Sequence, residues 1–159
     1  YRMSNYLQRR RLFETLGTGI IFKSLAARGI AYSAASLQPN GLFMPDVCIK
    51  LAENGIKTWW FEFRMEDDRG PDRRREMIAR QTAVSLIGRI ALMPPDRDRK
   101  ITVVTDSERL YEEFAGHAGE TSYAGELSVM LIDTSEVRIN KEEYIAGGSE
   151  TDGRRIILS

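Results

Sequence analysis

The feature that most constrains the fold is a stretch of alternating side chains within residues 42–65. Residues 57–64 are dense in threonine and aromatic side chains, which favour a pleated, half-buried strand. Because successive side chains of a strand point to opposite faces, the aromatic residues at positions 59, 61 and 63 share one face. Glu62 and Arg64 then lie side by side on the opposite face, together with Trp60.

A second strand is expected just before this one, over residues 47–51. Its alternation places Asp46, Cys48 and Lys50 on one face. Residues 52–55 lie between the two strands and end in Asn-Gly, the strongest short signal for a hairpin turn. If the two charged faces coincide, two carboxylates and neighbouring cations meet on one surface of a sheet.

The rest of the chain predicts helices that alternate with strands. One or two helices are expected over residues 3–28, with Gly17 and Gly19 as a potential break and Gly29 as a C-terminal cap. Asp72 is the expected N-cap of a helix that runs to about residue 92. The other predicted elements are a strand at 30–37, a strand at 101–105, a short helix at 108–114 after Asp106 and Ser107, a strand at 127–132, a short amphipathic segment at 137–145 and an edge strand at 155–158. This order predicts an α/β fold with a central mixed sheet and helices on both sides.

Length and composition fit a single domain over residues 1–159 that is able to bury a core. The 23 basic and 23 acidic residues cancel, so net charge alone does not indicate a nucleic-acid partner. A single cysteine excludes an internal disulfide and a cysteine-based zinc site, and it favours a reducing, cytoplasmic setting. The apolar runs are too short for a membrane span. Because the chain begins at Tyr1 without methionine, a fragment of a longer protein is one expectation.

The acidic residues of the two strands suit a magnesium site. Mg²⁺ prefers oxygen ligands and usually takes one or two protein carboxylates together with water and phosphate oxygens. Asp46 and Glu62, on adjacent strands, are able to supply those two carboxylates. Arg64 or Lys50, on the same strand faces, would orient a water molecule and offset the charge of a phosphate.

With these residues in this order, the chain resembles the PD-(D/E)XK nuclease-like superfamily. Pro45-Asp46 stands on the second strand, and Glu62-Phe63-Arg64 follows on the third, with Glu62 sixteen positions after Asp46. The resemblance covers residues 7–105 and implies a restriction-endonuclease-like αβββαβ core whose active members cleave DNA or RNA with Mg²⁺. It also implies that Asp46 and Glu62 bind the metal, that Glu14 joins them as in some branches, and that Gln81 has a catalytic role as in exonuclease-like branches. The tyrosine that those branches carry four residues later is replaced by Ser85.

Arg64 departs from the family pattern, because active members carry lysine there. Arginine is a planar, permanently charged fork, whereas lysine is a compact ammonium whose pKa shifts readily. Two functions therefore stay open: a Mg²⁺-dependent nuclease, with Lys50 substituting for the lysine, or a non-catalytic module that binds nucleic acid or a protein partner, including a second copy. The layout of residues 45–67 and 101–110 is also similar to mobile-element replication-relaxation and plasmid-transfer accessory proteins, which are DNA-associated.

The remaining candidates have ordinary structural interpretations that we favour. His117 is expected to be a surface residue, and Cys48 a small buried filler rather than a nucleophile. Trp59 and Trp60 are able to stack on bases, although one of two adjacent strand residues normally faces the core. Arginines occur in runs at 9–11 and 73–75, which suit either phosphate contacts or a solvated helix face. The second run opposes the dipole of its helix, which hints at an anion nearby.

Overall fold

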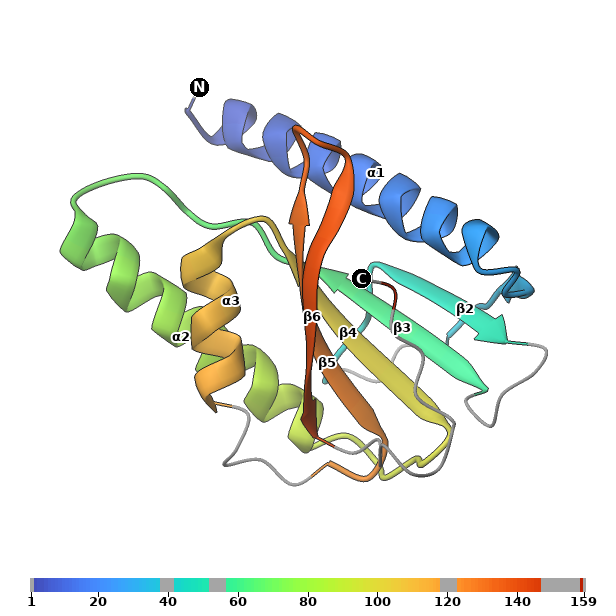
Figure 1. The fold of residues 1–159 in the computed structure, drawn as a ribbon. Helices are drawn as coiled ribbons and strands as arrows, with labels where there is room; N and C mark the ends of the chain where they lie inside the picture. Colours follow the sequence, from blue (N-terminus) through green and yellow to red (C-terminus); the bar gives the residue numbers. More distant parts are fainter. Residues whose placement is uncertain (1, 38–41, 52–56, 118–122, 147–157, 159) are drawn as a thin grey trace.

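The computed structural model describes residues 2–37, 42–51, 57–117, 123–146 and 158. Three helices surround one sheet of six strands (Figure 1). The elements in chain order are α1 (Arg2–Ala27), β1 (Tyr32–Ala34), β2 (Val47–Leu51), β3 (Thr58–Phe63), α2 (Asp72–Ala91), β4 (Arg99–Thr105), α3 (Glu108–His117), β5 (Glu126–Asp133) and β6 (Arg138–Ala146). The predicted α/β class, with a central mixed sheet flanked by helices, is confirmed. Among the described residues no helix is both long and apolar enough to span a bilayer.

The strands of the sheet lie in sequence order, from β1 at one edge to β6 at the other. Strands β1, β2 and β3 form an antiparallel meander, and β3, β4 and β5 are parallel to one another. Parallel neighbours need a crossover, which α2 supplies between β3 and β4 and α3 supplies between β4 and β5. Two consecutive right-handed crossovers in one direction place both helices on the same face. Figure 1 shows α2 and α3 together on one side of the sheet and α1 on the other.

Each face of the sheet is therefore covered, and two hydrophobic cores result. Trp60, Ile101 and Val103 face the buried stripe of α2, whereas Trp59 and Phe61 face α1. This split confirms the alternation predicted for β3. Strand β4 is buried along its whole length, which explains why its sequence is a short apolar run without alternation.

Helix α1 is a single helix, so the break expected at Gly17 and Gly19 is wrong. A β-carbon at position 17 would lie 2.5 Å from the Phe63 ring, so the glycine allows α1 to pack closely against the sheet. Gly29 has a positive φ of 67°, and the N–H of Ile30 donates to the Leu25 carbonyl. Gly29 thus ends α1 as predicted, in the manner of a Schellman motif.

The second helix begins one residue away from the prediction. Pro71 occupies the N-cap position, and Asp72 is the first helical residue, whose carboxylate binds Arg109 at 2.6 Å. The segment at 137–145 is strand β6. The predicted hairpin turn at 52–55 lies outside the described residues, as does the predicted edge strand except for Leu158.

Candidate functional site

The site begins where β2 and β3 pair. Val47 lies opposite Phe61 in the antiparallel register, and Asp46 directly precedes Val47, the first residue of β2. The backbone N–H of Asp46 donates to the Phe61 carbonyl at 3.0 Å, and Asp46 Oδ2 accepts the Phe63 N–H at 2.8 Å. These contacts fix the Asp46 carboxylate against β3. The side chains of Asp46 and Glu62 therefore share the face of the sheet that α2 covers.

The two carboxyl groups form a hydrogen-bonded pair. Glu62 is only 4% exposed. Burial raises the pKa of Glu62 to about 8, and the hydrogen bond to Asp46 adds to this effect while Arg64 opposes it. Two carboxylates in contact cannot both ionise without repulsion, so at neutral pH Glu62 keeps its proton.

Arg64 lies next to this pair and binds one end of it. Its Nη2 donates to Glu62 Oε2 at 2.8 Å, and its side chain remains 25% exposed. The Nε atom of Arg64 is buried and has no hydrogen-bond partner among the described residues. A buried guanidinium N–H without a partner costs free energy, so this donor indicates a ligand or a water molecule beside it.

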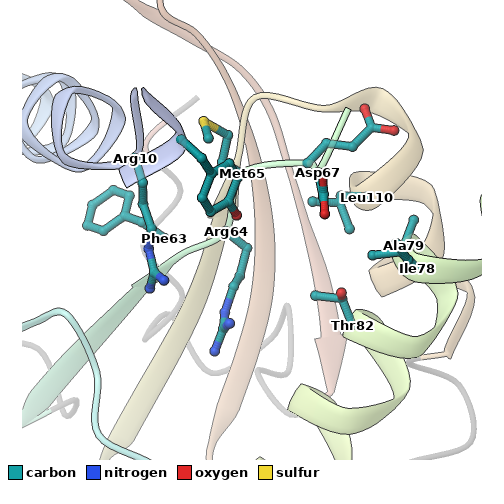
Figure 2. Close-up of a pocket in the computed structure, with 11 residues that line it drawn as sticks. Arg10, Phe63, Arg64, Met65, Asp67, Ile78, Ala79, Thr82 and Leu110 are labelled. Carbon is teal, nitrogen blue, oxygen red and sulfur yellow. The ribbon is translucent and has the colours of Figure 1, made fainter. Parts of the chain in front are cut away.

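A hollow of about 400 Å³ opens over the carboxyl pair. Its walls come from α1, the segment before β2, strand β3 with the residue that follows it, and the end of α2; the lining residues are Arg10, Leu42, Phe43, Met44, Asp46, Glu62, Arg64 and Arg89. A smaller hollow of about 180 Å³ lies beside it, between α1, α2, α3 and the end of β3 (Figure 2). Arg10 and Arg64 line both hollows, and Figure 2 shows their side chains extending in the same direction.

Glu14 comes near the pair without joining it. It lines a third hollow, of about 330 Å³, which Asp46 also borders but Glu62 does not. Its carboxylate accepts a hydrogen bond from Arg10 Nε at 3.1 Å. Within the described part of the chain, no group of three or more potential metal-ligating side chains occurs. The structure therefore brings together two of the three predicted metal ligands, Asp46 and Glu62.

Lys50 and Gln81 lie away from the pair. Lys50 is exposed and lies opposite Thr58, four residues and about 13 Å along β2 from Asp46. Gln81 is exposed on α2 and is rotated about 200° from the buried Ala79, so it faces away from the sheet. Neither residue lines the hollow above Asp46 and Glu62.

Arg89, and not Gln81, is the residue of α2 that lines the hollow over the carboxyl pair. It lies seven residues after Thr82, so both residues flank the buried stripe of α2 on the same side. The sequence signal for Arg89 was a basic residue at the border of the apolar stripe of α2. It is weak, because arginine beside an apolar stripe is common on surface helices.

Charged residues after β3 hold the other end of the site in place. Glu66 lies within 3.6 Å of both Arg75 and Arg109 and accepts a hydrogen bond from Ser107. Arg74 lies 3.9 Å from Asp67. The anion that the arginine run at 73–75 indicated is thus supplied, at least in part, by the chain itself.

The two tryptophans are unsuited to base stacking, because both are buried. Trp59 donates its indole N–H to Thr102 within the core, and Trp60 packs against Phe43. His117 lies 3.3 Å from Glu113, one turn earlier on α3. These residues complete the fold and do not reach the hollow over the carboxyl pair.

The comparisons with known proteins add no relative. No family model, no curated protein and no solved structure matches the chain. The case for a function therefore rests on the residues of the site.

Cys48 is half-buried beside the site, and its reactivity gives a direct check of its surroundings. Burial raises the pKa of the Cys48 thiol to about 11, although Lys50 opposes the shift. Because the thiolate is the reactive form, we expect alkylation by iodoacetamide to be slow at pH 7 and to accelerate about tenfold per pH unit up to pH 10. The measurement is the rate of mass increase against pH, with free cysteine as reference. A rate that levels off near pH 8.5 would contradict this environment.

Proposed function

We propose that the hollow over Asp46 and Glu62 is a phosphodiester-processing site for nucleic acid, most simply DNA, that works with Mg²⁺. The observation that carries this proposal is the meeting of two carboxyl groups from adjacent strands at the floor of a hollow whose walls carry three arginines. The order Pro45-Asp46, then Glu62-Phe63-Arg64, on a helix–three strands–helix–strand core supports it further. A cytoplasmic setting is part of the same proposal.

The donor set fits a magnesium ion bound through two carboxylates. Asp46 Oδ2 and Glu62 Oε2 already accept hydrogen bonds from Phe63 and Arg64, which leaves one oxygen of each carboxyl group for the metal. Mg²⁺ typically takes one or two carboxylates and fills its remaining positions with water and phosphate oxygens. The proton on Glu62 must leave before both carboxylates bind. When bound, the ion would supply a Lewis acid and a water molecule of lowered pKa.

The protein residues would then have separate roles. The Phe63 N–H holds the Asp46 carboxylate in place, so Asp46 would position the metal and, through it, the phosphate group. Arg64 has donors left after its bond to Glu62, and these would offset the negative charge of the phosphate in the transition state. Lys50 is too far along β2 to replace the missing lysine.

A second candidate function is a non-catalytic module that binds nucleic acid or a protein partner, including a second copy of the chain. The observation in its favour is the close hydrogen bond from Arg64 to Glu62, at 2.8 Å. This contact engages one carboxylate oxygen, and arginine lacks the adjustable pKa of the lysine that active members of the PD-(D/E)XK superfamily carry. A salt-sensitive gel shift without cleavage would favour this second function.

The two functions are separated by a cleavage assay. Plasmid and single-stranded DNA are incubated with the protein in Mg²⁺, in Mn²⁺ and in EDTA. We expect cleavage that requires the metal and is lost in Asp46→Asn, because asparagine still accepts the Phe63 N–H but removes a charged metal ligand. Equal cleavage by the wild type and Asp46→Asn would show a contaminant and would reject the catalytic function.

A further inference from the structure

Three arginines from three different elements line the larger hollow. Arg10 comes from α1, Arg64 follows β3, and Arg89 lies in the last turn of α2. These elements are far apart in sequence, so the fold itself assembles the cluster. Such a convergence differs from the arginine run at 73–75, whose members come from one helix and approach acidic side chains.

The lining of the hollow holds more arginines than acidic residues. The lining contains Arg10, Arg64 and Arg89 against two acidic residues, Asp46 and Glu62, while Glu14, outside the lining, pairs with Arg10. Guanidinium groups that gather in one hollow provide a site where an anion can bind several arginines at once.

Each arginine also keeps donors that show no hydrogen bond to the described residues. Arg10 bonds Glu14 through Nε, which leaves its two terminal nitrogens. Arg64 bonds Glu62 through Nη2, and its buried Nε has no partner among the described residues. No acidic side chain of the described ranges lies within ion-pair distance of Arg89. Forked guanidinium groups with free donors match the oxygens of a phosphate.

The rim of the hollow favours a nucleic-acid strand over a free phosphate ion. Leu42 and Met44 line the same hollow, and both are more than one third exposed. A sugar or base attached to the phosphate would cover these apolar side chains. Arg10 and Arg64 also line the neighbouring hollow, together with Glu66 and Asp67, so these two arginines border both hollows. An acidic peptide would satisfy the arginines as well, but its carboxylate side chains would not cover the exposed Leu42 and Met44.

We infer that Arg10, Arg64 and Arg89 form a phosphate clamp for a nucleic-acid strand, with Leu42 and Met44 against the adjoining sugar or base. The clamp needs no divalent cation, because its positive charge belongs to the protein. This inference depends on the proposed function in one respect only, which is that the ligand is a nucleic acid. The clamp adds Arg10 from α1 and Arg89 from α2 as binding residues. It also means that the protein binds nucleic acid whether or not it cleaves it.

The test measures the fluorescence anisotropy of a labelled single-stranded oligonucleotide in EDTA over a range of salt concentrations. We expect Arg89→Gln and Arg10→Gln each to raise the Kd about tenfold, since each removes charged hydrogen bonds to phosphate. Each should also lower the slope of log K against log salt by about 0.7, the value for one phosphate contact on a single strand. Arg89→Lys keeps the charge and should therefore keep the slope.

Arg80→Gln is the matched control. Arg80 lies on α2, is paired with Glu76 and does not line the hollow, so its removal should leave the Kd and the slope unchanged. Circular dichroism and the Tm of each variant establish that it is folded. Equal effects of Arg89→Gln and Arg80→Gln, or no binding by the wild type at low salt, would overturn the clamp.

Two further outcomes separate the possibilities. Polyglutamate should compete poorly with the oligonucleotide, and competition at equal charge concentration would reject the nucleic-acid clamp in favour of an acidic peptide partner. If Arg89→Gln weakens binding while the wild type never cleaves, the clamp is supported and the catalytic function fails. If the wild type cleaves but Arg89→Gln leaves the Kd unchanged, the clamp fails and the catalytic function is supported.

Discussion

Replacement of Lys100 by methionine should lower the free energy of unfolding by about 3–5 kcal/mol, the largest effect on stability that we expect in this chain. Lys100 and Glu142 form an ion pair at 3.3 Å, and both side chains are 0% exposed. The Lys100 ammonium also donates to the Tyr144 hydroxyl at 2.8 Å and lies 4.0 Å from the Trp59 ring centroid. Without the lysine, the Glu142 carboxylate would remain buried without its cation, which is why the loss is large.

Chemical denaturation of the wild type and the variants measures this effect. Lys57→Met is the matched control, because Lys57 also pairs with an aspartate but is 80% exposed, so its loss should cost at most about 1 kcal/mol. The double variant Lys100→Met/Glu142→Gln should be more stable than Lys100→Met alone, since no unpaired charge remains, the glutamine oxygen still accepts the Leu158 N–H, and the glutamine NH2 donates to Ser128 Oγ. Similar losses for Lys57→Met and Lys100→Met would contradict the buried pair.

Replacement of Glu62 by glutamine should reduce metal-dependent cleavage by about 100-fold or more while nucleic-acid binding in EDTA persists. Glutamine has nearly the same shape as the protonated glutamic acid that the apo site holds, so it should still contact Asp46 and Arg64. It cannot become the second carboxylate ligand of a metal. The Glu62→Gln variant should therefore lose cleavage activity and keep its affinity for nucleic acid.

Single-turnover cleavage rates and anisotropy, measured on the same preparations, check this expectation. Glu76→Gln is a suitable control because Glu76 is an exposed residue of α2 whose partner, Arg80, lies outside the hollow. A Glu62→Gln variant that cleaves at the wild-type rate would remove Glu62 from the catalytic centre. A variant that loses both binding and secondary structure would show that Glu62 has a structural role instead.

Strand pairing was predictable because side-chain direction in a strand follows directly from sequence. The split of Trp59 and Trp60 to opposite faces, and the position of Asp46 beside Glu62, need only the period of two and an antiparallel hairpin. Gly17 was misread for a physical reason. Its role depends on how closely Phe63 approaches from another element, and local sequence does not encode that distance.

The outer parts of the site were less predictable, because they depend on how helices lie over the sheet. Lys50 shares a face with Asp46, but a shared face does not bring residues four positions apart on a strand together. Gln81 is at a suitable distance along the chain and on the wrong side of α2. Arg10 and Arg89 reach the hollow only through the packing of α1 and α2, so nothing in the sequence links them to each other.

The most direct measurement is a crystal structure from crystals soaked in Mn²⁺, with anomalous diffraction locating the metal. The account predicts one strong peak over the carboxyl pair, at about 2.0–2.2 Å from one oxygen of Asp46 and one oxygen of Glu62. The hydrogen bond between the two carboxyl groups should then be broken, because the proton has left Glu62. No peak at this position, with Asp46 and Glu62 still bonded to each other at saturating Mn²⁺, would contradict a metal-assisted site.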